Sequence, residues 1–127
     1  LIAGLLMTVA VQSSSITTSI LVPLVAAGVL TLTNAFPVTL GANVGTTVTA
    51  LIASVAAESP DALIVAVAHL VFNVLGILIF YSWPPLRRIP LQLAVWTARA
   101  AVRHKSLVAA YVIGLFMVLP FAVILIA

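Results

Sequence analysis

The chain has 127 residues, of which 65% are apolar and only 6% are charged. Ordinary globular proteins carry about a quarter charged residues, so this composition excludes a water-soluble domain and predicts a membrane protein. The net charge of +3 comes from few, clustered groups, which excludes a nucleic-acid partner, and the chain has no cysteine, which excludes disulfides and thiol chemistry. Because it begins without methionine and is apolar to its last residue, we expect it to be part of a longer protein.

The first apolar region, residues 1–32, would form a continuous helix about 48 Å long, too long for one membrane crossing and too short for two. Its middle, residues 12–19, has seven polar residues in eight, between apolar arms of eleven and thirteen residues. We therefore expect a re-entrant hairpin whose polar tip lies at mid-membrane depth.

Residues 35–57 are long enough to cross the membrane, but residues 41–49 hold two glycines, an asparagine and three threonines. These residue types weaken a helix, so we expect a broken transmembrane helix here. Non-helical backbone at membrane depth must be buried in protein or line a water-filled cavity. The two polar runs should therefore face an interior and meet near the bilayer midplane.

Two further segments, residues 62–83 and 106–127, each have 22 residues without a Lys, Arg, Asp or Glu, which predicts full transmembrane helices. Between them, residues 84–105 hold all five basic residues, with apolar residues at helical spacing on one face. This pattern predicts an amphipathic helix in the membrane interface, on the cytoplasmic side by the positive-inside rule. The expected fold class is an all-α membrane protein with a re-entrant hairpin plus broken and full transmembrane helices.

No charged residue lies in the segments expected at membrane depth. An anion bound by the polar runs therefore needs compensation, since burying a bare charge costs several kcal/mol. Helix N-termini can supply part of it. A bound cation such as Na⁺, held by hydroxyl, amide and carbonyl oxygens, can supply the rest. The pattern favours coupled transport of an anion with a cation.

These runs and their order resemble the type II sodium-dependent inorganic phosphate cotransporter family, the Na/Pi cotransporters. The run Gln12–Ser15, followed by residues 17–24, is similar to the family's QSSS signature, and residues 39–47 are similar to its following motif. The resemblance continues through residues 69–78 and 84–90. It implies two inverted repeats, each with its own QSSS, and the chain, residues 1–127, looks like the second, C-terminal one.

The resemblance also implies the function, the partners and the site. The activity would be sodium-coupled symport of inorganic phosphate across the plasma membrane, or the inner membrane of a bacterium, with no cofactor beyond the co-transported Na⁺. The partners would be phosphate, Na⁺, the lipid bilayer and the first repeat of the same transporter, which carries the family's acidic Na⁺ ligand.

Carried over by position, the phosphate-binding residues would be Ser13, Ser14 and Ser15. The Na⁺ ligands would be Gln12, Ser13, Asn43, Thr46 and Thr49. The supporting residues would be Thr17, Thr18, Gly41, Gly45, His69 and Asn73. Where the family often has serine, this chain has Ala42, so no hydroxyl is available at that position.

Other interpretations compete with these. Hydroxyls can serve helix packing alone, and the Gly41–Gly45 spacing is also typical of a helix contact face. His69 and Asn73, four residues apart, suit an inter-helix hydrogen bond better than proton transfer. A related symporter could carry another small oxyanion or use H⁺, and the chain could be a purely structural helical subunit. An intramembrane serine hydrolase pairing Ser14 with His69 is disfavoured, because no G-x-S-x-G motif occurs, so we expect no enzyme.

Overall fold

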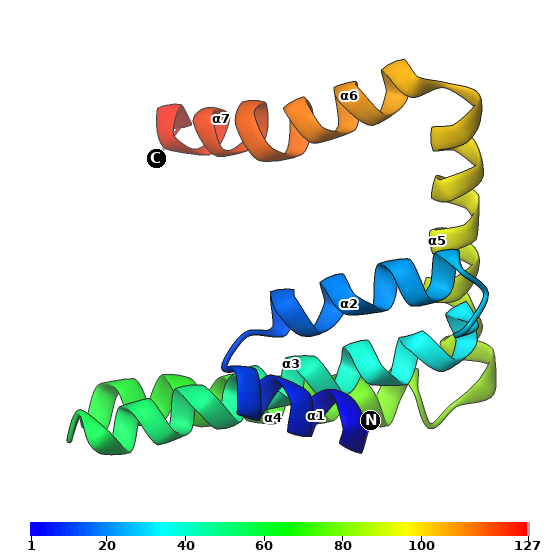
Figure 1. The fold of residues 1–127 in the computed structure, drawn as a ribbon. Coiled ribbons are helices and arrows are strands. Elements are labelled where there is room, and N and C mark those ends of the chain that lie inside the picture. The colour runs from blue at the N-terminus through cyan, green and yellow to red at the C-terminus, as the bar shows by residue number, and fades with distance from the viewer. Residues whose placement is uncertain (127) are drawn as a thin grey trace. The chain divides into compact units, whose positions relative to one another are not determined.

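A computed structural model describes residues 1–126, and all the regular elements in that range are helices (Figure 1). The helices are α1 (Ile2–Val11), α2 (Ser14–Ala26), α3 (Leu32–Ala56), α4 (Pro60–Phe80), α5 (Pro84–Arg103), α6 (Lys105–Ile113), the π-helix η1 (Gly114–Val118) and α7 (Leu119–Ile126). The chain forms two compact units, Leu1–Leu91 and Gln92–Ala127. The all-α prediction is confirmed for the described residues.

Three helical segments are long and apolar enough to cross a membrane, Leu32–Ala56, Pro60–Phe80 and Val108–Leu125. They correspond to the predicted segments 35–57, 62–83 and 106–127, with ends that differ by a few residues; Ala127 lies outside the described residues. Most of their large apolar side chains are exposed, and none of Val108–Leu125 is buried. Lipid or other parts of the protein must cover these surfaces.

In the first unit, α1 and α2 are the two arms of a hairpin, and both pack on α3 (Figure 1). Gly4 of α1 lies against Val38 and Ala42, and Thr8 lies against Gly45. The residue later in α1 therefore contacts the residue later in α3, so the two helices run in the same direction. Helix α4 returns antiparallel along α3 (Figure 1).

The predicted break in residues 35–57 is wrong, because α3 is one uninterrupted helix of 25 residues. The threonine hydroxyls donate to carbonyls of their own helix, Thr46 to Ala42, Thr47 to Val44 and Thr49 to Thr46. They therefore do not compete with the backbone ladder. The glycines serve contact, since a Cβ on Gly41 would overlap the backbone of Leu1. The helix-contact interpretation of the two glycines is confirmed.

The predicted hairpin in residues 1–32 does occur, but its break is shorter than the polar run. Helix α1 ends at Val11 and α2 begins at Ser14, so only Gln12 and Ser13 are non-helical. The remaining polar residues, through Ser19, form the first turns of α2. Whether the hairpin is re-entrant depends on a membrane, and that part of the prediction stays a prediction.

The α3–α4 connection has strong helix-start signals. The hydroxyl of Ser59 accepts a hydrogen bond from the N–H of Ala62, and Pro60 and Asp61 follow in the first turn. A proline there loses no helical hydrogen bond and a carboxylate favours the positive end of the helix dipole.

At the other end of α4, Arg87 lies 5.5 Å from the ring centre of Tyr81, within cation–π range.

The predicted amphipathic helix at residues 84–105 corresponds to α5, which has no buried residue and carries Arg103 in its last turn. Its interfacial, cytoplasmic position stays a prediction. In the second unit, the π-helix η1 ends at Val118, two residues before Pro120. The N–H of Leu119 donates to the carbonyl of Gly114, five residues back. Such a widened turn accommodates a proline, which lacks an N–H and clashes with the carbonyl four residues earlier.

Candidate functional site

The strongest candidate site is the turn between α1 and α2, residues Gln12–Ser15, which we name the tip turn. Gln12 ends α1 in the left-handed conformation with φ 56°. Ser13 is extended, with φ −151°, and caps α2, its hydroxyl accepting a hydrogen bond from the N–H of Ile16 at 3.3 Å. A serine whose side chain replaces the missing helical partner is a strong helix start. This local chemistry explains why the chain breaks here.

The break places two helix ends of opposite polarity next to each other. The last carbonyls of α1 have no helical N–H partner, and the N–H groups of Ser14 and Ser15 open α2 without an intrahelical acceptor. Carbonyl oxygens favour a cation, whereas free N–H groups and the positive end of the helix dipole favour an anion. The tip turn can therefore contact both members of an ion pair.

The side chains of the tip turn add hydroxyl and amide groups. Gln12 and Ser15 are exposed, and Ser13 and Ser14 are half-buried. Thr18 donates to the carbonyl of Ser14 at 2.8 Å. No hydrogen bond from the hydroxyls of Ser14 and Ser15 occurs within the described part of the chain, so both can bind a ligand.

Thr46 and Thr49 extend the face of α3 that α1 covers. Thr46 is four residues after Ala42, and Thr49 is four residues after Gly45, and α1 packs on both Ala42 and Gly45. Residues four apart share a helix face. Thr8 of α1 lies against Gly45 of α3. Because the two helices run in the same direction, one further turn along each of them leads to Gln12 and to Thr49. Both hydroxyls donate to α3 carbonyls, which leaves their oxygen lone pairs free to face a cation.

Asn43 is not brought to the tip turn. It lies two residues from both Gly41 and Gly45, about 200° around the helix, and it is exposed in a groove of α3 and α4 lined also by Phe72 and Asn73. The amide nitrogen of Asn73 donates to the backbone oxygen of Asn43 at 3.3 Å. Asn43 therefore lies on the α4 side of α3 and not on the face that α1 covers, and the inter-helix hydrogen bond expected of Asn73 is present.

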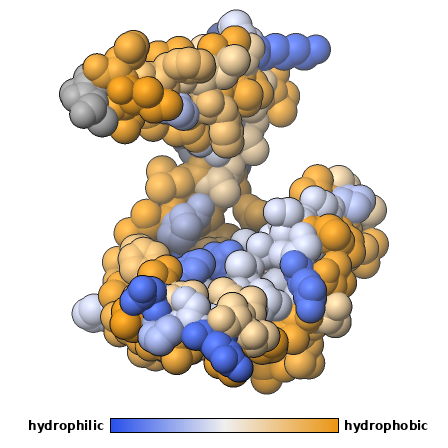
Figure 2. All heavy atoms as spheres, turned by 90° about the vertical axis from the view of Figure 1, so that its left-hand side faces the viewer, coloured by the Kyte–Doolittle hydropathy of each residue, from blue (hydrophilic) through white to orange (hydrophobic). Residues whose placement is uncertain are grey.

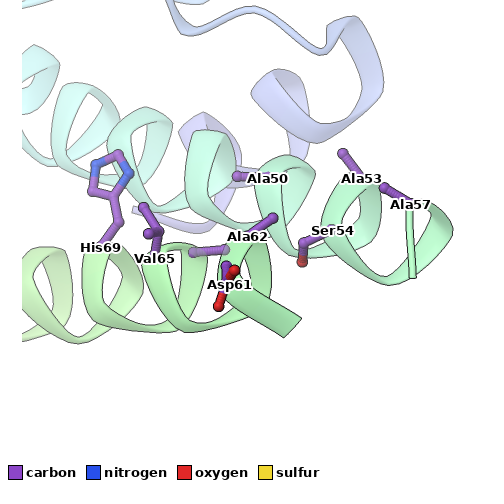
Figure 3. Close-up of a pocket in the computed structure, with 9 residues that line it drawn as sticks. Ala50, Ala53, Ser54, Ala57, Asp61, Ala62, Val65 and His69 are labelled. Atoms are coloured by element: carbon purple, nitrogen blue, oxygen red, sulfur yellow. The ribbon is translucent and has the colours of Figure 1, made fainter. Parts of the chain in front are cut away.

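His69 lies on α4 at a cleft of about 610 Å³ between α3 and α4 (Figure 3). Alanines line most of the cleft, together with Ser54 of α3 and Asp61 of α4 (Figure 3). The tip turn contributes no residue to its lining. The pairing of Ser14 with His69 that a serine hydrolase needs therefore has no support in the contacts of the described residues.

The structure adds Thr8, which the sequence interpretation did not single out. Thr8 and Thr17 are both completely buried, and the Thr8 hydroxyl donates to the Thr17 hydroxyl at 3.0 Å. The signal in the sequence was a lone threonine in an apolar arm, four residues before Gln12 and so on its helix face. Viewed from the side where α1 ends and α3 turns into α4, the first unit shows hydrophilic residues gathered among hydrophobic ones (Figure 2).

Comparison with known proteins gives this geometry a context. The model of the Na⁺/Pi-cotransporter family matches residues 1–97. Sodium-dependent phosphate transport protein 2C of Homo sapiens is 41% identical over 124 residues, 95% of this chain and 20% of that protein. Protein 2B of Bos taurus is 37% identical over 126 residues, 97% of this chain and 18% of that protein.

Protein 2A of Ovis aries is 36% identical over 123 residues, 94% of this chain and 19% of that protein. The chain thus spans about a fifth of the length of these curated relatives. No solved structure was found to match it. The family model covers both the tip turn and the α3 face beneath it, and the chain belongs to the Na⁺/Pi-cotransporter family.

Proposed function

We propose that the protein containing this chain is a Na⁺-coupled symporter of inorganic phosphate, and that the tip turn binds both ions. One observation carries the proposal. The break at Gln12 and Ser13 brings the last carbonyls of α1 and the first N–H groups of α2 within a few residues of each other, in a segment without fixed charge, in a chain of the Na⁺/Pi-cotransporter family. The relatives are named sodium-dependent phosphate transport proteins, which supports both ions.

Phosphate would contact the hydroxyls of Ser13, Ser14 and Ser15 and the free N–H groups that open α2. These are donors, as a doubly charged oxyanion requires. None of them carries a formal charge, so the anion needs a cation nearby to offset the cost of leaving water. That requirement is the physical reason for coupling, because phosphate binds well only when Na⁺ occupies the neighbouring oxygens.

Na⁺ would be held by the side-chain oxygens of Gln12, Ser13, Thr46 and Thr49, together with carbonyls at the end of α1. A hard cation takes several oxygen ligands, and an unwound helix end supplies them. Asn43 stays outside this set, because it faces α4. Thr17, Thr18, Gly41 and Gly45 would support the site by holding α1, α2 and α3 together.

The site would be completed by the first repeat of the same transporter, inverted in the plasma membrane relative to this one. The exposed apolar surfaces of α4 and of Val108–Leu125 leave room for that repeat and for lipid. The hairpin α1–α2 would be re-entrant, and α5 would lie in the cytoplasmic interface with its arginines at the lipid headgroups. No catalytic step and no resident cofactor are part of this function.

The test is uptake of radiolabelled phosphate by vesicles that contain the whole transporter. We expect uptake that requires a Na⁺ gradient and that Ser14→Ala abolishes, whereas Ser82→Ala, an exposed serine in the α4–α5 connection, leaves it unchanged. Uptake that continues at full rate in choline buffer, or that a proton gradient alone drives, would overturn the proposal. Competition by arsenate and sulfate then measures how strictly these donors select phosphate among tetrahedral oxyanions.

A further inference from the structure

We propose that Thr8 and Thr17 form a buried hydroxyl relay that positions the tip turn for Na⁺ binding. The inference rests on the proposed function, since it assigns a positioning role at the same site. It concerns two residues that do not themselves touch the ions. Neither threonine is exposed, and the relay connects α1 with α2.

The relay has two hydrogen bonds in sequence. The Thr8 hydroxyl donates to the Thr17 hydroxyl at 3.0 Å, and the Thr17 hydroxyl donates to the carbonyl of Ser13 at 3.1 Å. Each hydroxyl has a single proton. Since Thr17 uses its proton on Ser13, Thr8 must be the donor between the two threonines, which fixes the direction of the relay.

The Ser13 carbonyl is thereby held inside α2. It accepts the N–H of Thr17 at 3.2 Å as well as the Thr17 hydroxyl, so both of its lone pairs are occupied. Ser13 is left with its hydroxyl for ligands, and the orientation of the turn that carries it depends on the relay.

Thr8 also ties the relay to α3. A Cβ on Gly45 would come within 2.7 Å of the Thr8 Cβ and 3.0 Å of its Cγ2, so the threonine methyl lies directly on the glycine. Thr49 is one turn further along the same face. Thr8 therefore sets the position of α2, which carries the phosphate donors, relative to the α3 hydroxyl proposed for Na⁺.

The relay differs from the other threonine hydrogen bonds of the described residues. Thr18, Thr39, Thr46, Thr47, Thr49 and Thr97 donate to carbonyls of their own helix. The Thr8–Thr17 contact is the one hydrogen bond in the described part that joins two side chains. An inter-helix bond at full burial, directly behind a ligand-bearing turn, indicates positioning rather than satisfaction of a helix ladder.

The experiment compares Thr8→Val, Thr17→Val and the double variant in the whole transporter, with uptake normalised to the amount of protein in the membrane. Valine keeps the shape and removes the hydroxyl. We expect the Na⁺ concentration at half-maximal uptake to rise roughly three- to tenfold, which is the range for one lost hydrogen bond, with little change in maximal rate. Thr17→Val should have the larger effect because it breaks both bonds, and the double variant should match it.

Two controls separate positioning from general damage. Thr8→Ser keeps the donor and should restore Na⁺ affinity, while Thr97→Val removes an exposed intrahelical hydroxyl and should change nothing. Additive effects in the double variant, or an unchanged Na⁺ dependence in Thr17→Val, would contradict the relay. A wild-type protein without Na⁺-dependent phosphate uptake would contradict the proposed function instead.

A second measurement tests the relay without transport. The chain has no cysteine, so the pair Thr8→Cys and Thr17→Cys is unique within it. We expect mild oxidation to join them by a disulfide, which protects both thiols from a maleimide label in the denatured protein until a reducing agent is added. If correctly folded protein, present at wild-type amounts, gives no cross-link, the two side chains are not in contact and the relay is wrong.

Discussion

The two polar runs of this chain look alike in sequence but differ in structure. The chain leaves the helix at Gln12 and Ser13, inside the run 12–19, whereas the run 41–49 stays helical throughout. Both runs are rich in small and hydroxyl residues. The difference shows that the presence of such residues does not by itself break a helix. What decides the outcome is whether their side chains bond to the N–H groups that open a new helix or to the carbonyls of a continuing one.

In the first run, the Ser13 hydroxyl accepts a backbone N–H and so begins a new helix. In the second run, every threonine hydroxyl donates to a carbonyl of the continuing helix, and two glycines are covered by α1. A cap stops one helix and starts another, whereas a back-bonded threonine leaves the ladder intact. The first run thus supplies free backbone groups for ions, and the second supplies a surface.

The largest expected effect concerns this surface. A Cβ on Gly4 would overlap the backbone carbonyl of Val38, and one on Gly41 would overlap the backbone of Leu1. Neither backbone group can move without separating α1 from α3. We expect Gly4→Ala and Gly41→Ala to cost several kcal/mol, in the range of severe overpacking, and to leave little folded protein in the membrane by fluorescence-detected size-exclusion chromatography.

The matched control is Gly76→Ala in α4, where an added Cβ meets nothing within 4 Å. This variant should be recovered at wild-type amounts. If Gly4→Ala and Gly41→Ala are recovered as well as Gly76→Ala, α1 does not pack on α3 as closely as the structure has it, and the second run loses its role as a contact surface.

The next largest effect distinguishes two roles of Gln12, the backbone conformation that ends α1 and the side-chain amide proposed to bind Na⁺. Gln12 has φ 56°, a conformation that glycine adopts without strain. If the residue served only to end α1, Gln12→Gly would be neutral or stabilising. Because we assign its amide oxygen to Na⁺, we expect half-maximal uptake to need about tenfold more Na⁺, as for a lost bond to a charged group.

Glu58 provides the control for that experiment, since it also has a positive φ, 48°, in the turn between α3 and α4. Glu58→Gly removes a side chain from the same backbone conformation and should leave Na⁺ dependence unchanged. Equal behaviour of Gln12→Gly and Glu58→Gly would reduce Gln12 to a conformational role.

The sequence predicted much of this fold because its strongest signals are local. Hydropathy and charge located the spans and α5, and the polar run 12–19 located the hairpin, although the break itself is confined to Gln12 and Ser13. The continuity of α3 was not predictable in this way. Glycine weakens an isolated helix, and only the approach of α1 shows that Gly41 and Gly45 are compensated by packing.

The candidate site was predictable to the same degree. The tip turn follows from residue types, but the separation of Asn43 from Gln12 depends on which face of α3 each helix covers. The role of Thr8 depends on a contact with Thr17 nine positions away. Sequence periodicity gives the faces of a helix and leaves their partners open.

A smaller effect tests the two faces of α3 against each other. Thr47 and Thr49 both donate within the helix, at 2.7 Å and 2.8 Å, but Thr49 shares the face of Gly45, whereas Thr47 is two residues away from it. We expect Thr49→Val to raise the Na⁺ concentration at half-maximal uptake by roughly threefold to fivefold, as for one neutral ligand lost. Thr47→Val should leave it unchanged, and a larger effect at Thr47 would move the cation site to the α4 side.

The smallest expected effect concerns the α3–α4 contact. The Asn73 amide donates to the backbone oxygen of Asn43, and inter-helix hydrogen bonds in membranes contribute about 0.6 kcal/mol on average. Asn73→Leu should therefore lower the thermal unfolding midpoint slightly and leave Na⁺-dependent uptake intact. Asn43→Ala should leave the midpoint unchanged, because the acceptor is a main-chain carbonyl that alanine retains. A loss of uptake in Asn73→Leu at full protein amount would instead assign Asn73 to the ion pathway, and the α4 side of α3 would then be functional rather than structural.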